Sequence, residues 1–318
     1  MKKLRIGVVG AGYLGKFHAQ KYYNMPDVDL VGVVDTNGGR GKKVAQENQT
    51  AYFPDHQSLF DKVDAVSIAA PTPVHYSIAK DFLANGVDVL IEKPITSLLK
   101  DADELLQIAD SKGLIIQVGH LERFNPAVVA LNGKIDQPRF IESHRLSIFQ
   151  GRCTDVSVVL DLMIHDIDLI LNLVRSELKT VNAAGISVIS GNVDIANARL
   201  EFENGAVANV TASRISAKNE RKLRLFQKNA YISIDFANHN ITLVHPDPSQ
   251  SDGIIPGMQI EQLTFDKSDA LDDELKSFVH AVKNRQQPLV TGKMGRDALK
   301  TALSIMSQIK ETSQHLVG

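Results

Sequence analysis

The sequence predicts two domains: an α/β domain with a doubly wound parallel sheet, then an α+β domain with a large, open-faced, mainly antiparallel sheet. Short apolar runs alternate with helical segments over the first 122 residues, which is typical of a parallel sheet with crossover helices. A glycine-rich turn follows the first apolar run. Later in the chain, alternating apolar and polar residues form consecutive short segments, as in antiparallel strands. We therefore place the domains at residues 1–122 and 123–318.

The stretch from residue 4 to residue 35 has the order of a dinucleotide-binding fingerprint. An apolar run leads into Gly10-Ala11-Gly12-Tyr13-Leu14-Gly15, and a second apolar run ends at Asp35. Gly10 makes the tight turn, Gly12 lets the backbone approach a pyrophosphate, and Gly15 lets the helix pack closely on its strand. The helix that begins near Tyr13 directs its N-terminal amides at the phosphates. The stretch predicts a Rossmann domain that binds a nicotinamide dinucleotide.

The residue at the tip of the second strand bears on the choice of cofactor. The Asp35 carboxylate would accept hydrogen bonds from the adenosine ribose and repel a 2′-phosphate. Thr36 follows it, and no arginine comes immediately after. Arg40, Lys42 and Lys43 would tolerate a phosphate, but they also suit a solvated helix face. The sequence therefore favours NAD over NADP.

Composition excludes several classes of protein. Lys and Arg total 35 against 37 Asp and Glu in 318 residues, which gives no reason to expect a nucleic acid or an anionic membrane as partner. The single cysteine, Cys153, rules out a disulfide within the chain and suits a reducing compartment. No stretch approaches the length of a membrane span, and glycines interrupt the first apolar run where a signal peptide would be continuous. We expect a soluble, cytoplasmic protein and predict no metal site.

Alternating segments continue the first domain after residue 35. We expect helices at 40–48, 74–85 and 97–111, and strands near 50–52, 64–70, 87–91 and 114–118. The segment 64–70 is almost continuously apolar, which indicates a strand buried on both faces. Ligands of such sheets bind outside the carboxyl ends of the strands. Three tips should therefore face the cofactor: 10–15, 70–75 and 92–94.

The alternation of predicted strands and helices ends after residue 126. We expect a strand at 139–149, a long apolar helix at 156–174, and strands at 181–189, 194–202, 206–212, 222–227, 231–236 and 241–244. Asn204-Gly205 predicts a tight hairpin between two of them. Helices should follow at 269–284 and 295–312. One face of such a sheet needs cover, so we expect a partner subunit in a homodimer or homotetramer.

Four polar residues on the long apolar helix are candidates for chemistry. Their spacing of four, three and four predicts one stripe on the helix, made of Asp161, His165, Asp168 and Asn172. Burying these groups is costly unless something satisfies them. A single histidine there would more often be structural, whereas four polar residues in register favour a functional site. Oxidation of an alcohol needs a base, and a neutral imidazole such as that of His165 suits this role.

A lysine at the third strand tip completes the candidate chemistry. Lys93 lies in Glu92-Lys93-Pro94, where the proline favours an extended conformation for the lysine. A cation beside the reacting oxygen would stabilise a developing alkoxide. The ordinary interpretation is a solvated charge, but this tip is one of those expected to face the cofactor.

These motifs resemble the glucose–fructose oxidoreductase/inositol dehydrogenase family over essentially the whole chain. The resemblance rests on the glycine turn with His18, Pro71-Thr72-Pro73 with His75, Glu92-Lys93-Pro94, and Asp161 with His165. It implies a Rossmann domain followed by an open-faced sheet domain that mediates oligomers. It also implies a catalytic lysine, Lys93, with Asp161 orienting the sugar and either Lys93 or His165 taking the hydroxyl proton. The two later strand tips give Ala70, Pro71, Thr72, His75, Glu92 and Lys93 as predicted cofactor-binding residues. The resemblance adds Gln117, which would line the nicotinamide.

Two segments, 119–127 and 155–168, narrow the resemblance to nucleotide-sugar 3-dehydrogenases. This subgroup includes enzymes that oxidise UDP-N-acetylglucosamine at C3 so that an aminotransferase can install an amine. A UDP-sugar needs cations for its diphosphate. Arg123, Arg145, Arg152 and Arg214 are candidates, although each also suits an ordinary ion pair. Arg123 and Asn125 are our predicted substrate-binding residues in the first of these segments.

The leading hypothesis is therefore an NAD-dependent dehydrogenase of a UDP-amino sugar. A second hypothesis keeps the chemistry but uses a free sugar or inositol. A third uses NAD transiently to break a glycosidic bond. A fourth is a dinucleotide-binding sensor without turnover, against which the intact Lys93, Asp161 and His165 argue.

Overall fold

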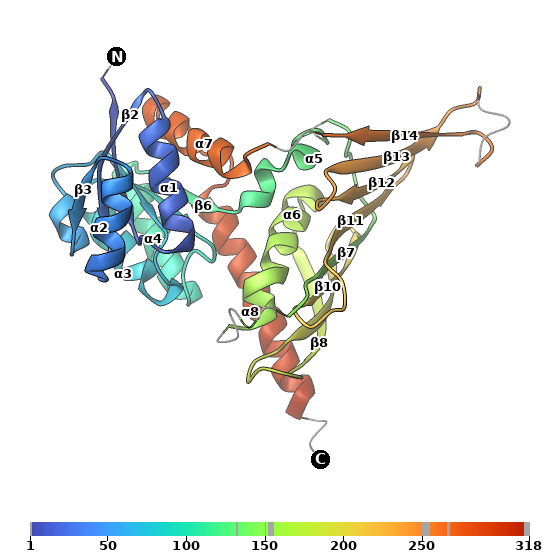
Figure 1. Cartoon of the computed structure of the whole chain (residues 1–318). Helices are drawn as coiled ribbons and strands as arrows, with labels where there is room; N and C mark the ends of the chain where they lie inside the picture. Colours follow the sequence, from blue (N-terminus) through green and yellow to red (C-terminus); the bar gives the residue numbers. More distant parts are fainter. Residues whose placement is uncertain are drawn as a thin grey trace. The chain divides into compact units, whose positions relative to one another are not determined.

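The computed structural model describes residues 2–131, 133–149, 151, 156–249, 255–265 and 268–314 (Figure 1). It divides into two compact units. The first comprises Met1–Leu121 and Asp269–Leu299, and the second Glu122–Ser268 and Lys300–Gly318. Arg152 and Cys153 lie outside the described residues, so the predictions made for them have no structural counterpart here.

The first unit is built on a parallel sheet with the strand order β3-β2-β1-β4-β5-β6. The order reverses between β1 and β4, and this is where doubly wound sheets bind dinucleotides. β4 and β5 are buried at every residue, as expected for strands covered on both faces. The strands are β1 (Leu4–Val9), β2 (Val28–Val34), β3 (Ala51–Phe53), β4 (Ala65–Ile68), β5 (Asp88–Glu92) and β6 (Ile116–Gly119).

Helices flank this sheet and complete the predicted Rossmann fold. α1 packs beside α2 and α7, and α3 packs beside α4. The short 3-10 turns η1, η2 and η3 span His56–Leu59, Thr72–Val74 and Leu121–Phe124. The helices are α1 (Tyr13–Asn24), α2 (Gly38–Glu47), α3 (His75–Ala84), α4 (Leu99–Lys112), α7 (Ala270–Asn284) and the start of α8 (Gly292–Gln314).

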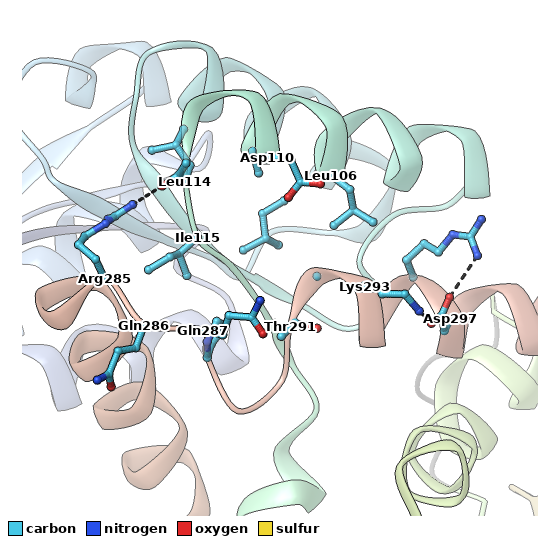
Figure 2. A pocket seen from close by; sticks show the side chains of 16 residues that line it. Leu106, Asp110, Leu114, Ile115, Arg285, Gln286, Gln287, Thr291, Lys293 and Asp297 are labelled. Atoms are coloured by element: carbon cyan, nitrogen blue, oxygen red, sulfur yellow. Dashed lines mark hydrogen bonds and ion pairs between the residues drawn. The ribbon is translucent and has the colours of Figure 1, made fainter. Parts of the chain in front are cut away.

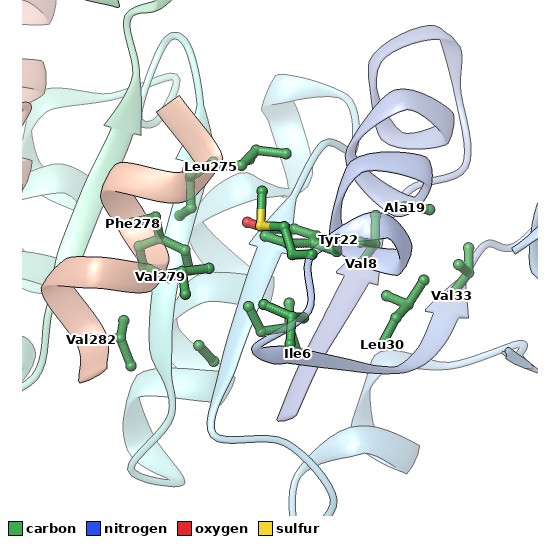
Figure 3. Close-up of a cluster of buried hydrophobic side chains, with 14 of the residues drawn as sticks. Ile6, Val8, Ala19, Tyr22, Leu30, Val33, Leu275, Phe278, Val279 and Val282 are labelled. Atoms are coloured by element: carbon green, nitrogen blue, oxygen red, sulfur yellow. The ribbon is translucent and has the colours of Figure 1, made fainter. Parts of the chain in front are cut away.

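The grouping of α7 differs from the predicted domain boundary. The sequence placed all of 123–318 in the second domain, whereas Asp269–Leu299 belongs to the first unit. The physical reason is burial, because α7 contributes to the same apolar core as β1, β2 and α1 (Figure 3). The apolar spacing of the segment predicts a helix, but it does not reveal which core that helix joins. The labelled members of this core are Ile6, Val8, Ala19, Tyr22, Leu30, Val33, Leu275, Phe278, Val279 and Val282.

The second unit is built on a larger sheet with the order β14-β13-β12-β11-β7-β10-β9-β8. β7 and β10 run parallel and their other neighbours antiparallel, which confirms the mainly antiparallel prediction. Asn204-Gly205 joins β9 to β10, and Gly205 has a φ of +81°. The strands are β7 (Phe140–Leu146), β8 (Leu178–Ile186), β9 (Ile195–Phe202), β10 (Val207–Ser213), β11 (Glu220–Gln227), β12 (Ala230–Asp235), β13 (Asn240–Pro246) and β14 (Met258–Thr264).

Helical segments cover one face of this sheet. α6 (Ile164–Val174) continues directly from a π-helical turn, η4 (Val159–Met163), and lies along the sheet (Figure 1). α5 (Pro126–Val129) is a single short turn. β7 alternates buried with half-buried residues, so one face packs inside and the other stays accessible. Across the described residues, the helices all lack the combined length and apolar character that crossing a bilayer would require.

Candidate active site

The parallel strands of the first unit end level with one another. Val9 is aligned with Val34 on β2 and with Ile68 on β4, and Ile68 is aligned with Ile91 on β5. The segments that follow these strands therefore emerge at one edge of the sheet, at the switch point between β1 and β4. This register brings the three predicted tips to the same edge.

The glycine turn fits a bound pyrophosphate. Gly10 has a φ of +95°, and a Cβ there would lie 2.6 Å from the Ala69 carbonyl oxygen. A Cβ on Gly15 would lie 1.7 Å from the Gly10 carbonyl oxygen, so the start of α1 packs directly on the turn. A Cβ on Gly12 would meet no described atom within 4 Å. The backbone at Gly12, the N-cap of α1, is thus open to a ligand, and the amides of α1 attract its negative charge.

Asp35 binds the glycine turn to the end of β2. Its carboxylate accepts the amide of Ala11 at 2.7 Å and that of Asn37 at 2.7 Å. Arg40 adds a bidentate pair, with Nε at 3.0 Å and Nη2 at 2.9 Å. Burial alone would raise the pKa of Asp35, but these donors hold it below its ordinary value. The carboxylate is ionised, and adenosine ribose hydroxyls would replace the half-exposed Arg40 guanidinium at the same oxygens.

His75 joins the second tip to the third. Its Nε2 lies 2.7 Å from the Ala70 carbonyl oxygen and its Nδ1 lies 2.9 Å from that of Pro94. The ring is 1% exposed, and burial lowers the pKa of His75 although both carbonyls favour the protonated form. His75 therefore fixes the two loops, while Pro71 is exposed and Thr72 half-exposed on the second.

The third tip is supported from beneath by a buried acid. Glu92 Oε1 lies 3.1 Å from His18 Nε2, and His18 Nδ1 lies 2.7 Å from Ser67 Oγ. The other Glu92 oxygen accepts the Lys93 amide at 3.3 Å. Burial would raise the pKa of Glu92, but the hydrogen bond from His18 holds it below its ordinary value. A Cβ on Gly119 would approach Glu92 Oε2 to 2.9 Å, so this carboxylate fills the space beside Gly119.

A second buried acid comes from α7. Glu274 is 1% exposed, and its carboxyl oxygens have no hydrogen-bond partner among the described residues. Burial raises the pKa of Glu274 well above its ordinary value, and the negative charge of Glu92 adds to this. Gln117 is fully buried and donates to the backbone carbonyl of Glu274 at 3.0 Å. Gln117 thus fixes α7, and its contact with a cofactor stays a prediction.

In the second unit the predicted polar stripe occupies two environments. Asp161 lies in the π-helical turn η4, and its side chain is 24% exposed. His165 is half-buried in the first turn of α6. Asp168 is 2% exposed and receives Arg123 Nε at 2.6 Å and Nη2 at 3.1 Å. The π turn changes the helical phase after Asp161, and only part of the stripe is reachable from solvent.

Buried ion pairs also engage Arg145, another of the predicted cations. Arg145 donates to Asp166 at 2.8 and 2.9 Å and to Glu122 at 2.9 Å. Burial would lower the pKa of Arg145, but its two acidic partners raise it. Asn125 accepts the Ala127 amide at 3.1 Å and so caps α5. These residues hold the start of the second unit to β7 and α6, and substrate binding by Arg123 and Asn125 stays a prediction.

A separate cavity of about 650 Å³ lies in the first unit among the end of α4, the start of β6 and the segment between α7 and α8 (Figure 2). It contains none of the predicted site residues. Its cations are already engaged by acids, because Arg285 pairs with Asp88, Lys293 with Asp297, and Arg296 with Asp103. Because the cations of the lining are paired with acids, they do not indicate which ligand the cavity would bind.

Two family models match the chain. Residues 4–120 match the model described as an oxidoreductase family with an NAD-binding Rossmann fold. Residues 127–233 match the GFO/IDH/MocA C-terminal domain. The chain belongs to the GFO/IDH/MocA oxidoreductase family. This confirms the resemblance inferred from the motifs and, with the two sheets, the predicted fold class.

Individual members of the family are similar over the whole length. The chain is 38% identical over 306 residues to a UDP-N-acetylglucosamine 3-dehydrogenase of Acidithiobacillus ferrooxidans, covering 96% of this chain and 97% of that one. A crystal form of that organism's enzyme matches with a TM-score of 0.93 at 37% identity, covering 98% and 99% of the two chains. A scyllo-inositol 2-dehydrogenase of Bacillus subtilis is 28% identical, covering 91% and 89%.

Sequence reasoning missed several buried charges near the predicted residues. Glu274 lies in a segment assigned to the other domain, and Asp166 follows His165 off the predicted stripe. The pairing of Arg40 with Asp35 had a sequence signal, since the arginine is five residues away on the first turn of a helix. Asp194, a fully buried acid, had no charged partner in the sequence to signal it, because it accepts backbone amides and the Ser190 hydroxyl in the loop between β8 and β9.

The buried acid on α7 gives a prediction for stability. A protein that contains a carboxyl whose pKa is raised on folding loses stability as pH rises from the unfolded pKa of about 4.3 through the folded value. We expect Glu274→Gln to gain free energy of unfolding relative to wild type as pH rises above about 4.3, at up to about 1.4 kcal/mol per pH unit. Urea denaturation across this range measures the difference. Glu47→Gln, on the exposed face of α2, is the control, and parallel curves for wild type and Glu274→Gln would contradict the prediction.

Proposed function

We propose that this protein is an NAD-dependent dehydrogenase that oxidises the C3 hydroxyl of a UDP-N-acetyl amino sugar by hydride transfer to the nicotinamide. The observation that carries the proposal is full-length similarity to a UDP-N-acetylglucosamine 3-dehydrogenase, at 38% identity over 96% of the chain. The glycine turn, the ionised Asp35 and the level strand ends support a dinucleotide on the first unit. NAD supplies the hydride acceptor when it is bound.

The residues have separate roles in this reaction. Loss of hydride from a secondary alcohol requires that the hydroxyl proton also leaves. Lys93 and His165 are the two candidates for the group that takes it, and the other would stabilise the charge on oxygen. Asp161, half-exposed in its π turn, orients the sugar by accepting hydrogen bonds from its hydroxyls. Glu92 holds the backbone amide of Lys93 and thereby the position of the lysine.

A dehydrogenase of a free sugar or inositol is the second candidate. The specific observation in its favour is the similarity to a scyllo-inositol 2-dehydrogenase that covers 91% of this chain. The chemistry of Lys93, Asp161 and His165 would be unchanged. The two candidates differ in whether a nucleotide diphosphate is recognised.

Three further parts of the proposal concern cofactor and partners. NAD is preferred over NADP because the Asp35 carboxylate lies at the end of β2.

The half-exposed sheet face, where Phe226 packs against Phe140 and Tyr231 at 5.7 and 4.9 Å between ring centroids, would be covered in a homodimer or homotetramer. Oxidation of a secondary alcohol by NAD is usually unfavourable at equilibrium, so we infer a consuming enzyme such as an aminotransferase.

Formation of NADH tests the reaction directly. NAD is mixed in turn with UDP-N-acetylglucosamine, glucose and inositol, with an aminotransferase and its amino donor present to remove product, and NADH absorbance is followed. Of the three compounds, we expect only UDP-N-acetylglucosamine to be turned over. Turnover with inositol would favour the second candidate. If none of these compounds reduces NAD while NAD raises the melting temperature, the sensor and glycosidase hypotheses gain and the proposed reaction fails.

Removal of either candidate base should abolish most of the activity. We expect Lys93→Ala and His165→Ala each to lower kcat at least about a hundredfold, the usual scale for a general acid or base. NAD binding, measured by titration, should be retained. Lys62→Ala and His245→Ala serve as controls, because both residues are accessible and neither is among the predicted cofactor-binding or substrate-binding residues. A variant with near-normal turnover would remove that residue from the mechanism.

Loss of the acid at the end of β2 should relax cofactor choice. Asp35→Ala removes the like charge that opposes a 2′-phosphate, a repulsion worth several kcal/mol. We expect the ratio of kcat/KM for NAD to that for NADP to fall at least about tenfold. Thermal melting checks that the glycine turn survives without the carboxylate. An unchanged ratio in a folded variant would contradict the role given to Asp35.

A further inference from the structure

A buried arginine lies directly behind the candidate substrate-orienting acid. Arg214 follows the end of β10 and is 5% exposed. Its Nη2 donates to the Val156 carbonyl oxygen at 2.6 Å. The same nitrogen lies 3.8 Å from Asp161 Oδ2, within ion-pair distance but longer than a hydrogen bond. One guanidinium thus contacts both the segment that leads into η4 and the carboxylate that η4 carries.

The backbone of Arg214 is itself fixed. Its amide donates to the Asp194 carbonyl oxygen at 3.0 Å. Asp194 is fully buried, and its carboxylate accepts the amides of Val188, Ile189 and Ser190 at 2.9, 2.7 and 2.9 Å. Burial would raise the pKa of Asp194, but these donors and the Ser190 hydroxyl lower it. The arginine therefore starts from a hairpin end that an ionised acid holds together.

The loop between β8 and β9, which holds Asp194, also fixes the start of the helix that carries Asp161. The Val158 amide donates to the Val193 carbonyl oxygen at 3.0 Å. Ser157 accepts the Asp161 amide on its carbonyl at 3.0 Å and the Val159 amide on its hydroxyl at 3.3 Å. Backbone and guanidinium contacts thus converge on the π turn, and π turns recur at functional sites.

We propose that Arg214 is the positioning residue for Asp161, an inference that rests on the proposed function. The side chain of Arg214 is 6% exposed and that of Asp161 is 24% exposed, so a buried cation supports a carboxylate that solvent reaches. A charge pair with a buried member is less screened than one at the surface. The planar guanidinium serves the Val156 carbonyl and the Asp161 carboxylate together, which an ammonium does poorly.

This assignment replaces a direct contact between Arg214 and the diphosphate. A bidentate phosphate contact needs an accessible edge of the guanidinium. The side chain of Arg214 is 6% exposed, and its Nη2 is directed at Val156 and Asp161. The effect of Arg214 on the reaction should therefore pass through Asp161.

A first experiment compares variants at this position. Arg214→Gln should lower kcat/KM for the sugar nucleotide at least about tenfold, with NAD affinity unchanged. Arg214→Lys keeps the charge and should recover part of the loss. Arg199→Gln, on an exposed arginine of β9 that pairs with Glu201, is the matched control and should behave as wild type. Wild-type kinetics in a folded Arg214→Gln variant would overturn the proposal.

A double-mutant cycle separates positioning from a purely structural role or a phosphate contact. In an Asp161→Asn background, Arg214→Gln should lower kcat/KM less than about twofold further, because the group it positions is already neutral. The affinity for UDP alone, measured by calorimetry, should be unchanged in Arg214→Gln. Multiplicative losses in the cycle, or a tenfold loss of UDP affinity, would overturn the assignment.

A structural readout keeps this inference separate from the proposed function. If the wild-type enzyme does not oxidise UDP-N-acetylglucosamine, the proposed function fails, whereas crystal structures still decide the role of Arg214. We expect the Asp161 carboxylate to be displaced in Arg214→Gln and to return part of the way to its original place in Arg214→Lys. An Asp161 side chain in its original place in Arg214→Gln would overturn the inference even where the reaction holds.

Discussion

The dinucleotide site of the first unit depends on strands that end level with one another. Because Val9, Val34 and Ile68 are aligned across three strands, the glycine turn, Asp35 and the Ala70 loop all begin at one edge of the sheet. The side chains then join these loops pairwise. Asp35 binds the glycine turn, and His75 binds the Pro94 loop. A shift of one of these strands by a residue would move the loop that follows it away from the other two.

Buried charge is handled differently in the two units. Among the residues that the structure describes, the second unit pairs its buried arginines with an acid or a carbonyl, as in Arg123 with Asp168 and Arg145 with Asp166. The first unit instead buries two acids that influence each other: the hydrogen bond with His18 holds the pKa of Glu92 below its ordinary value, whereas burial raises the pKa of Glu274. Because the pKa of Glu274 is raised on folding, its contribution to stability falls as pH rises.

The glycine turn, the alternating first domain and Asp35 could be predicted because local spacing alone carries them. The same alternation predicts a doubly wound parallel sheet, whereas the order of its strands is known from the structure alone. The membership of α7 could not be predicted, since its apolar stripe suits either core. β14 (Met258–Thr264) was missed because Gln259, Glu261 and Gln262 give it little apolar character. The π turn was also missed, since regular α-helical spacing was assumed from Asp161 to Asn172. The pairing of Arg214 with Asp161 could not be predicted, because the two residues are far apart in the sequence.

The close approach of Glu92 to Gly119 constrains how this protein can vary. The acid occupies the volume that any larger residue at position 119 would need, and it is held there by His18 on α1. Replacing the glycine would push the carboxylate off His18 and disturb the loop that carries Lys93. Positions 18, 92 and 119 should therefore change together during evolution or not at all, and an engineer who alters one must redesign the other two.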